Sequence, residues 1–253
     1  MSAYLQQVLA DSPLHYWRFA ESAGGLAHDI GSSRFQLHGL GTAIAPVFGY
    51  SGPNSDGGCA DLCLDGQYVN TGNPVTLSVN PFSLELLYWG WQRQATTVQL
   101  AQIQSANQIA LFHDATTWRY VYNGVTISTN HNFTWQAWHH FVINYDGANM
   151  NLYVDGFRVG PTAAGAQASL STLLEISTNS ALSAFSGGYF SELAYYTTAL
   201  SALRVSNHFG AIDQLSNTPV AQSSSGDSGS GGSGLSIILA EIRAAVYRTM
   251  ETH

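Results

Sequence analysis

The chain has 253 residues, of which 45% are hydrophobic and only 9% are charged. Globular chains are usually about 25% charged, so this composition excludes a disordered acidic segment and a coiled-coil rod. The net charge is −8, and all eight basic residues are arginines, scattered from Arg18 to Arg248. Phosphate groups and anionic lipids require clustered cations, so we expect neither nucleic acid nor a membrane as a partner.

In chain order, residues 1–222 are predicted to form short strands with few helices. A helix is expected at residues 3–10, and a second at 202–209 follows the N-cap residue Ser201. The clearest hairpin joins 138–145 to 150–154 through a turn at Asp146-Gly147. About a dozen strands with frequent turn signals predict an all-β fold, a two-sheet antiparallel sandwich or a barrel. The other expected strands are 14–19, 82–89, 98–104, 109–113, 118–122, 125–129, 157–159, 173–177 and 188–196.

Two features bear on the cellular compartment. The opening residues MSAYLQQVLADSP contain neither a basic n-region nor an apolar h-region, so we expect synthesis in the cytoplasm without a signal peptide. Cys59 and Cys63 lie four positions apart, too far to bond within an extended strand. We therefore predict buried or half-buried free thiols in a reducing compartment.

A flexible segment divides the chain at residues 223–234, which read SSSGDSGSGGSG. Residues 235–253 after it are predicted to form an amphipathic helix, because their large apolar residues fall on one stripe at 100° per residue. Such a stripe favours anchoring to a larger assembly or self-association into a small bundle, with folding back onto residues 1–222 as the alternative. The stripe consists of Leu235, Ile238, Leu239, Ile242, Val246 and Met250.

Five segments, in this order, carry a family resemblance: SPLHYWRFAESAGG with HDIGSS, LCLDGQYVNTG, FSLELLYW, WHHFVINYDGANMNLYVDG and SGGYFSELAYYTTALSALRVSNHF. Together they resemble laminin-G-like, concanavalin-A-like jelly-roll domains over residues 4 to about 212. The resemblance implies a two-sheet antiparallel jelly roll for residues 1–222. Family members of this form are common in bacteriophage tail and head-associated proteins, so it also implies a virion context.

The resemblance raises the question of calcium. Many relatives carry an Asp-Glu pair on the closing strand and hold calcium between it and the opening Asp loop, but here the pair reads Ser191-Glu192. Calcium takes 6–8 oxygen ligands, so a site built from Asp29, Glu192 and backbone carbonyls is weakened. The alternative is that Asp29 caps a turn. We expect no cofactor.

No residue set in the sequence carries the pattern of a hydrolase. Glycosidases need two carboxylates facing each other across the bond that they cut, whereas Glu85, Glu175 and Glu192 each stand alone on their strands. His139 and His140 are adjacent on a strand and point to opposite faces, so they cannot bind one metal ion together. One of them is expected to face solvent. We predict that the protein is not an enzyme.

Aromatic residues in the centre of the chain make glycan binding the alternative to a purely structural role. Of Trp89, Trp91, Trp118, Trp135 and Trp138, at least three are expected in the core. The candidate glycan-binding residues are Trp91 with Arg93, which follow a strand end, and the polar loop of Asn130, Asn132 and Trp135.

We therefore predict a non-enzymatic structural or accessory protein of a bacteriophage virion. Its C-terminal helix would bind other virion proteins or further copies of the chain, and its jelly roll would bind host cell-surface carbohydrate. The alternative is a receptor-binding lectin of the tail, and a carbohydrate-active enzyme is disfavoured.

Overall fold

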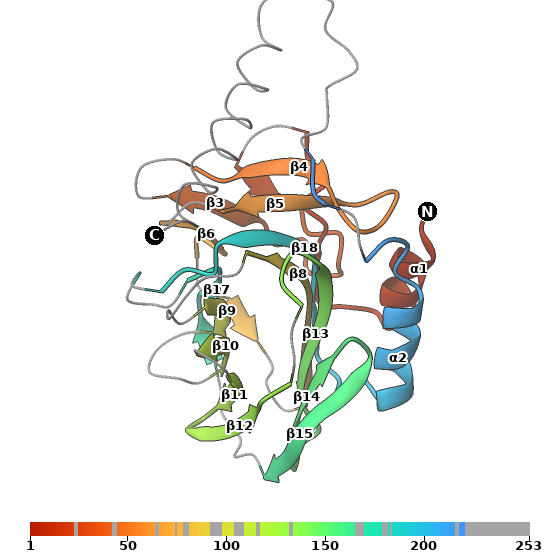
Figure 1. Ribbon diagram of the computed structural model, residues 1–253, viewed down its shortest axis with the longest axis vertical. Coiled ribbons are helices and arrows are strands. Elements are labelled where there is room, and N and C mark those ends of the chain that lie inside the picture. The colour runs from red at the N-terminus through yellow and green to blue at the C-terminus, as the bar shows by residue number, and fades with distance from the viewer. Residues whose placement is uncertain are drawn as a thin grey trace, which may run out of the picture.

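A computed structural model of the chain describes residues 1–22, 25–41, 45–63, 66–73, 75–77, 81–91, 98–103, 109–114, 117–131, 134–164, 170–178, 182, 184–215 and 218–220. Within them, two antiparallel sheets pack face to face and two helices cover one sheet from outside (Figure 1). The helices are α1 (Ala3–Ala10) and α2 (Ala202–Gly210), as predicted. Each begins after a serine whose hydroxyl accepts the backbone N–H three residues further on.

The sheet beneath the helices is called sheet A. Its central strand β8 (Phe82–Gly90) pairs with β13 (Trp138–Tyr145) on one side and β18 (Gly188–Tyr196) on the other. Because β8 is covered by the helices on one face and by the second sheet on the other, all nine of its residues are buried. The strand order is β15 (Phe157–Ala164), β14 (Asn149–Val154), β13, β8, β18, β5 (Gly58–Leu62), β4 (Val47–Ser51), with β1 (His15–Trp17) also paired to β18.

The second sheet, called sheet B, has its strands in the order β12 (Val125–Thr129), β11 (Thr117–Tyr122), β10 (Ile109–Asp114), β9 (Val98–Ile103), β17 (Leu174–Ile176), β6 (Gln67–Asn70), β3 (Leu37–Gly41), β2 (Leu26–Ala27). A short separate pair is formed by β7 (Val75–Leu77) and β16 (Leu170–Thr172). The two large sheets bear out the predicted sandwich.

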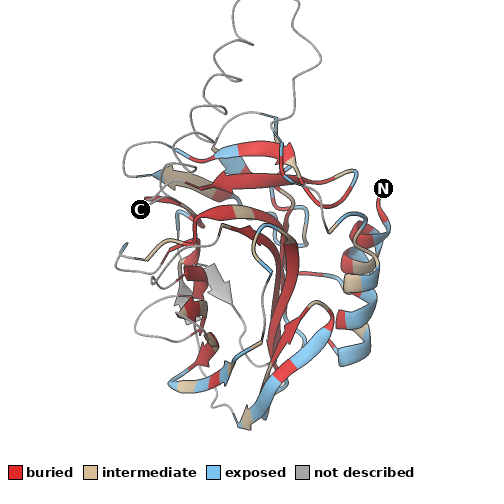
Figure 2. Cartoon of the chain, viewed as in Figure 1, coloured by how far each residue is buried: buried red, intermediate tan, exposed pale blue. Residues whose placement is uncertain are grey.

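Two apolar clusters hold the layers together, and Figure 2 shows the burial that they produce. The inner cluster lies between the sheets and includes Leu84, Trp118 and Phe141. The outer cluster packs Tyr4 of α1 and Val205 of α2 against the other face of sheet A. Burying apolar surface stabilises the folded state by about 25 cal/mol for each Å², so both clusters are main sources of stability.

Tight turns fix the register of the hairpins in both sheets. Asn123-Gly124 joins β11 to β12, and Asp155-Gly156 joins β14 to β15. Their φ angles are 46° and 83° in the first turn and 51° and 80° in the second. Two successive left-handed residues are what a two-residue turn of the primed type requires, so the predicted hairpins are confirmed.

Several side-chain predictions can be compared with this fold. Trp89, Trp118 and Trp138 are fully buried, as expected for at least three of the five central tryptophans. Cys59 and Cys63 are buried thiols that form no disulfide, as predicted. The expectation that one of His139 and His140 faces solvent is wrong, since they are only 8% and 0% exposed. Sheet A is covered on both faces, so neither side of β13 offers an open position. The predicted linker 223–234 and helix 235–253 lie outside the described residues.

Candidate functional site

Trp91, the first glycan candidate, follows directly after β8. Its indole Nε1–H donates to Cys63 Sγ at 3.3 Å, and its ring meets Trp89 edge-on at 4.7 Å between centroids. It is half-buried against the outer cluster. The structure therefore uses part of its aromatic surface for packing. Arg93, predicted beside it, lies outside the described residues.

Trp135, the second candidate, lies in the loop before β13. Its ring packs edge-on against His113 at 5.8 Å, and the loop is fixed where Gln136 N–H donates to Gly90 O at 2.9 Å. Trp135 packs on the inner cluster, whereas Trp91 packs on the outer one. The two candidates thus lie near the same end of β8 but on opposite faces of sheet A.

Asn130, in the same predicted loop, is exposed, and its Oδ1 accepts a hydrogen bond from Thr117 Oγ1 at 3.1 Å. Asn132 lies outside the described residues. The structure therefore separates two of the candidate residues, Trp91 and Trp135, by placing them on opposite faces of sheet A.

Asp29, proposed as a metal ligand, acts as the anchor of a loop. Its carboxylate accepts the backbone N–H groups of Tyr16, Gly31 and Phe35 at 2.7–2.8 Å. His15 Nδ1 lies 2.8 Å from the same carboxylate. Four protein groups therefore bond to its oxygens, which is the arrangement expected if Asp29 caps a turn.

Glu192, the other proposed ligand, is fully buried on β18 and bound to a cation of the protein itself. Arg18 donates to it through Nε at 3.0 Å and Nη2 at 2.8 Å. Asn54 Nδ2 adds a bond of 3.1 Å, and the Tyr16 hydroxyl donates as well. The neighbouring Ser191, where relatives often have Asp, donates to a backbone carbonyl.

This donor set does not fit calcium. A calcium ion at Glu192 would face the Arg18 guanidinium at hydrogen-bond distance from the same oxygens, and Asp29 has its own separate donors. Across the described part of the chain, no group of three or more His, Cys, Asp or Glu side chains is arranged to hold a metal ion. Arg18 also pairs with Asp56 at 2.8 Å. Although burial raises the pKa of Asp56, hydrogen bonds from Arg18 and Ser2 lower it below its usual value.

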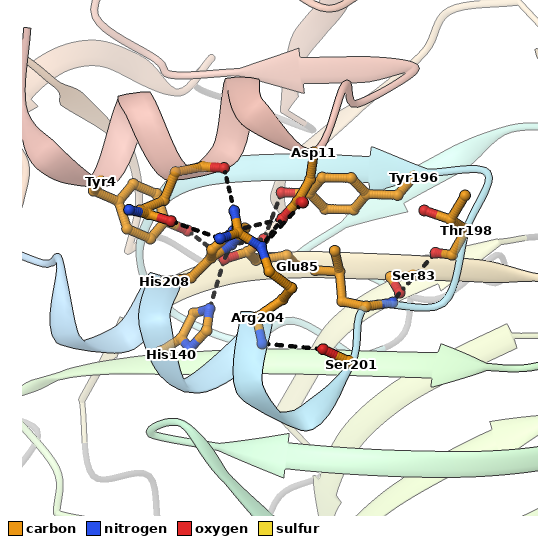
Figure 3. Close-up of polar contacts among 12 residues, drawn as sticks. Tyr4, Asp11, Ser83, Glu85, His140, Tyr196, Thr198, Ser201, Arg204 and His208 are labelled. Carbon is orange, nitrogen blue, oxygen red and sulfur yellow. Dashed lines mark hydrogen bonds and ion pairs between the residues drawn. The ribbon is translucent and has the colours of Figure 1, made fainter.

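The largest polar cluster was not expected from the sequence. It centres on Glu85, which is fully buried on β8 beneath both helices (Figure 3). Its carboxylate accepts from the hydroxyls of Tyr4 at 2.7 Å and Tyr196 at 2.6 Å. His140 Nε2–H donates to it at 2.7 Å, and His208 Nδ1 lies 3.0 Å from both of its oxygens.

His208 links this carboxylate to a second one. Its Nε2 lies 2.8 Å from Asp11 Oδ2, so both ring nitrogens face carboxylates and both must carry a proton to donate. Although burial favours the neutral ring, the two acids outweigh it and raise the pKa of His208. Arg204 pairs with the same aspartate, since its Nε lies 2.9 Å from Asp11 Oδ2 (Figure 3). Acidic and basic groups therefore alternate from Glu85 through His208 and Asp11 to Arg204.

The Glu85 cluster is a buried connection between the two helices and sheet A. Burial raises the pKa of Glu85, but the two histidines reverse this and hold it well below the usual range. Glu85, His140 and His208 are all 0% exposed, so no substrate reaches them. The cluster ties α1, through Tyr4 and Asp11, and α2, through Arg204 and His208, onto sheet A.

The antiparallel two-sheet sandwich defines the class of protein, a jelly roll. The sequence profile of the concanavalin A-like lectin/glucanases superfamily, in its third laminin-G form, matches residues 65–206, more than half of the chain. The chain therefore belongs to this family. A search among curated proteins finds no match. Among the described residues, no helix is both long and apolar enough to cross a membrane.

Solved structures share the fold at low sequence identity. Domain 4 of AbnA, an extracellular arabinanase of Geobacillus stearothermophilus solved with arabinotriose, superposes with a TM-score of 0.58 at 14% identity, covering 78% of this chain and 98% of that one. The botulinum neurotoxin serotype D ligand-binding domain, solved with N-acetylneuraminic acid, gives 0.60 at 10% identity, covering 83% and 52%. Trypanosoma rangeli sialidase, solved with the inhibitor DANA, gives 0.58 at 14% identity, covering 78% and 32%. The chain spans about half the length of the neurotoxin chains that it matches.

Proposed function

We propose that the chain is a non-enzymatic carbohydrate-binding protein. The observation that carries the proposal is the family membership, in a superfamily of lectins and glucanases, together with similar structures solved with arabinotriose and N-acetylneuraminic acid. Fold alone does not determine function, so the choice between lectin and glucanase rests on the carboxylates. Glu85 and Glu192 are both fully buried and each is bonded to protein donors, which leaves neither free to act as an acid or a nucleophile. Glu175, the third strand glutamate, is paired with Asn70 and Gln102 on the neighbouring strands, so no second carboxylate lies directly opposite it.

We further propose that this protein is displayed on a bacteriophage virion, where it binds host surface glycans. The support is the sequence resemblance and the path of the chain at its last described residues. Val220 N–H donates to Ser51 Oγ at 2.9 Å, and Ser51 N–H donates to Val220 O at 2.9 Å. Val220, three positions before the predicted Ser/Gly linker, thus lies beside the edge strand β4, which suits a tether to a separate anchoring helix. A receptor-binding lectin of the tail is the alternative.

Two measurements on the full chain test the carbohydrate-binding proposal. On a printed glycan array, we expect concentration-dependent binding to at least one glycan, lost when the protein is unfolded by heat. On arabinan and other soluble polysaccharides, we expect no release of reducing sugar. An array without signal contradicts the binding proposal, and sustained sugar release contradicts the non-enzymatic one.

A further inference from the structure

A row of polar side chains crosses the outer face of sheet B. Pairing places His38 opposite Asn70, Asn70 opposite Glu175, and Glu175 opposite Gln102, on the adjacent strands β3, β6, β17 and β9. Directly paired residues project from the same face of a sheet. Neighbouring strands lie about 4.8 Å apart, so these four side chains span about 14 Å.

The row faces away from the apolar core. On β17, Leu174 and Ile176 belong to the inner cluster, so the side chain between them, Glu175, points to the other face. The same alternation holds on β6, where Val69 packs inward. Tyr68 is two positions before Asn70 on the same strand, so it points to the same face as Asn70, where it is half-buried.

Within the described part of the chain, Glu175 differs from Glu85, Glu192 and Asp29 because one of its carboxylate oxygens has no hydrogen-bond partner. It is 6% exposed, its Oε2 is fully enclosed without a hydrogen bond, and burial alone raises its pKa. Glu85, Glu192 and Asp29 are buried to a similar degree but are each satisfied by several donors. An unpaired buried polar group destabilises a protein, so its presence calls for an explanation.

We propose that the row centred on Glu175 is a glycan subsite, in which the Glu175 carboxyl group bonds a sugar hydroxyl. This inference rests on the proposed carbohydrate binding and gives it a location. Asn70 and Gln102 flank Glu175 with amide groups. Asn70 Oδ1 accepts from Gly72 N–H at 2.9 Å, and the NH2 group of the same amide can donate to a sugar hydroxyl. Tyr68 adds an aromatic ring beside them.

The surroundings of Glu175 favour a neutral hydroxylated ligand over a cation. The neighbours paired with it carry amides and no second carboxylate, whereas a hard cation needs several charged or carbonyl oxygens. The central residues Asn70, Glu175 and Gln102 are 5–8% exposed, and His38 at the β3 end is half-buried. A ligand would therefore reach the row from the β3 end.

The first measurement distinguishes a Glu175 carboxylate that serves ligand binding from one that stabilises the fold. In the full chain, Glu175→Gln should raise the melting temperature by a few degrees at pH 8, because a neutral amide of the same shape avoids burying an unpaired charge. The gain should shrink toward pH 4.5, where the wild-type carboxyl is protonated. The matched control is Asp227→Asn, which removes the same charge from the predicted Ser/Gly linker and should leave the melting temperature nearly unchanged.

Binding is then measured on a glycan array that carries arabinotriose and N-acetylneuraminic acid. Glu175→Leu, which cannot hydrogen-bond, should lower the wild-type signal at least tenfold, and Asp227→Asn should not change it. If the Leu variant does not fold, Glu175→Met serves for the same comparison.

The outcomes are distinguishable. Wild-type binding that Glu175→Leu leaves within twofold overturns this inference and leaves the proposed function intact. A melting temperature that falls in Glu175→Gln also overturns it, because the carboxylate then has a stabilising partner in the free protein. An array on which the wild-type chain binds nothing overturns the proposed function and this inference together.

Discussion

The Glu85 carboxylate and the His208 imidazole lie 3.0 Å apart in the interior, although 123 positions separate them in the sequence. Neither is exposed to solvent. This pair, with Asp11 on the far side of the ring, joins β8 to both helices. The docking of α1 and α2 therefore depends on charge as well as on apolar packing.

Removing the Glu85 charge should destabilise the protein strongly. Glu85→Gln leaves the charged His208 ring against a neutral amide, and breaking a buried pair in this way costs about 3–5 kcal/mol. Urea unfolding of the full chain measures this loss. The control is Asp213→Asn, an exposed acid whose carboxylate accepts from Ser55, for which we expect less than about 1 kcal/mol. Equal losses in the two variants would show that Glu85 has no special role.

The same pair predicts the pH dependence of stability. The pKa of Glu85 is lowered from its usual 4.5, so its contribution is present above pH 4.5 and is lost as the pH falls through the lower folded value. The pKa of His208 is raised from its usual 6.5, so its contribution is full below pH 6.5 and is lost as the pH rises through the higher folded value. The two contributions are therefore both full between about pH 4.5 and 6.5.

The variant His208→Gln isolates the alkaline limb of this profile. The difference in unfolding free energy between wild type and variant should be largest below pH 6.5 and should shrink above it, because the wild-type ring then loses its second proton. Denaturant titrations at several pH values measure the difference. A difference that grows above pH 6.5 would mean that His208 is neutral in the folded protein.

Calcium should have little effect on stability. The Glu192 carboxylate is paired with Arg18, and the Asp29 oxygens accept hydrogen bonds from backbone N–H groups, so neither residue offers free oxygens for the ion. We expect the same melting temperature in chelator and in excess calcium. A fall of more than about 10 °C in chelator would reveal a bound ion, since a saturated site adds several kcal/mol.

The predicted C-terminal helix should be the assembly element. Ile242→Asp puts a charge on the apolar stripe and should abolish oligomers of the full chain, as should deletion of residues 235–253. The control Ala244→Asp adds the same charge about 160° away around the helix and should leave assembly unchanged. Light scattering during size-exclusion chromatography measures the mass. An Ile242→Asp protein with unchanged stoichiometry would rule out the helix as the anchor.

The sequence predicts local features of this fold better than distant contacts. The hairpin turns at Asn123-Gly124 and Asp155-Gly156 follow from residues that tolerate left-handed backbone, and the N-cap Ser201 marks the start of α2. Strands β3, β4 and β5 were not predicted, because glycines interrupt their short alternating patterns.

The use of each acidic side chain could not be predicted, because it depends on partners from elsewhere in the chain. Arg18 and Glu192 are 174 positions apart, and only the folded sheet shows that the arginine occupies the expected calcium ligand. His139 and His140 were correctly predicted to point to opposite faces, since Phe141 packs inward and Val142 outward on the same strand. Their burial depends on the helices and on sheet B, which no local pattern shows.

The proposed carbohydrate binding is tested most directly by titrating the full wild-type chain on a glycan array, with heat-unfolded protein as the control. The account predicts saturable binding of the folded chain to at least one glycan at micromolar concentrations or below, and background signal for the unfolded chain. Background signal for the folded chain across the whole array would contradict it.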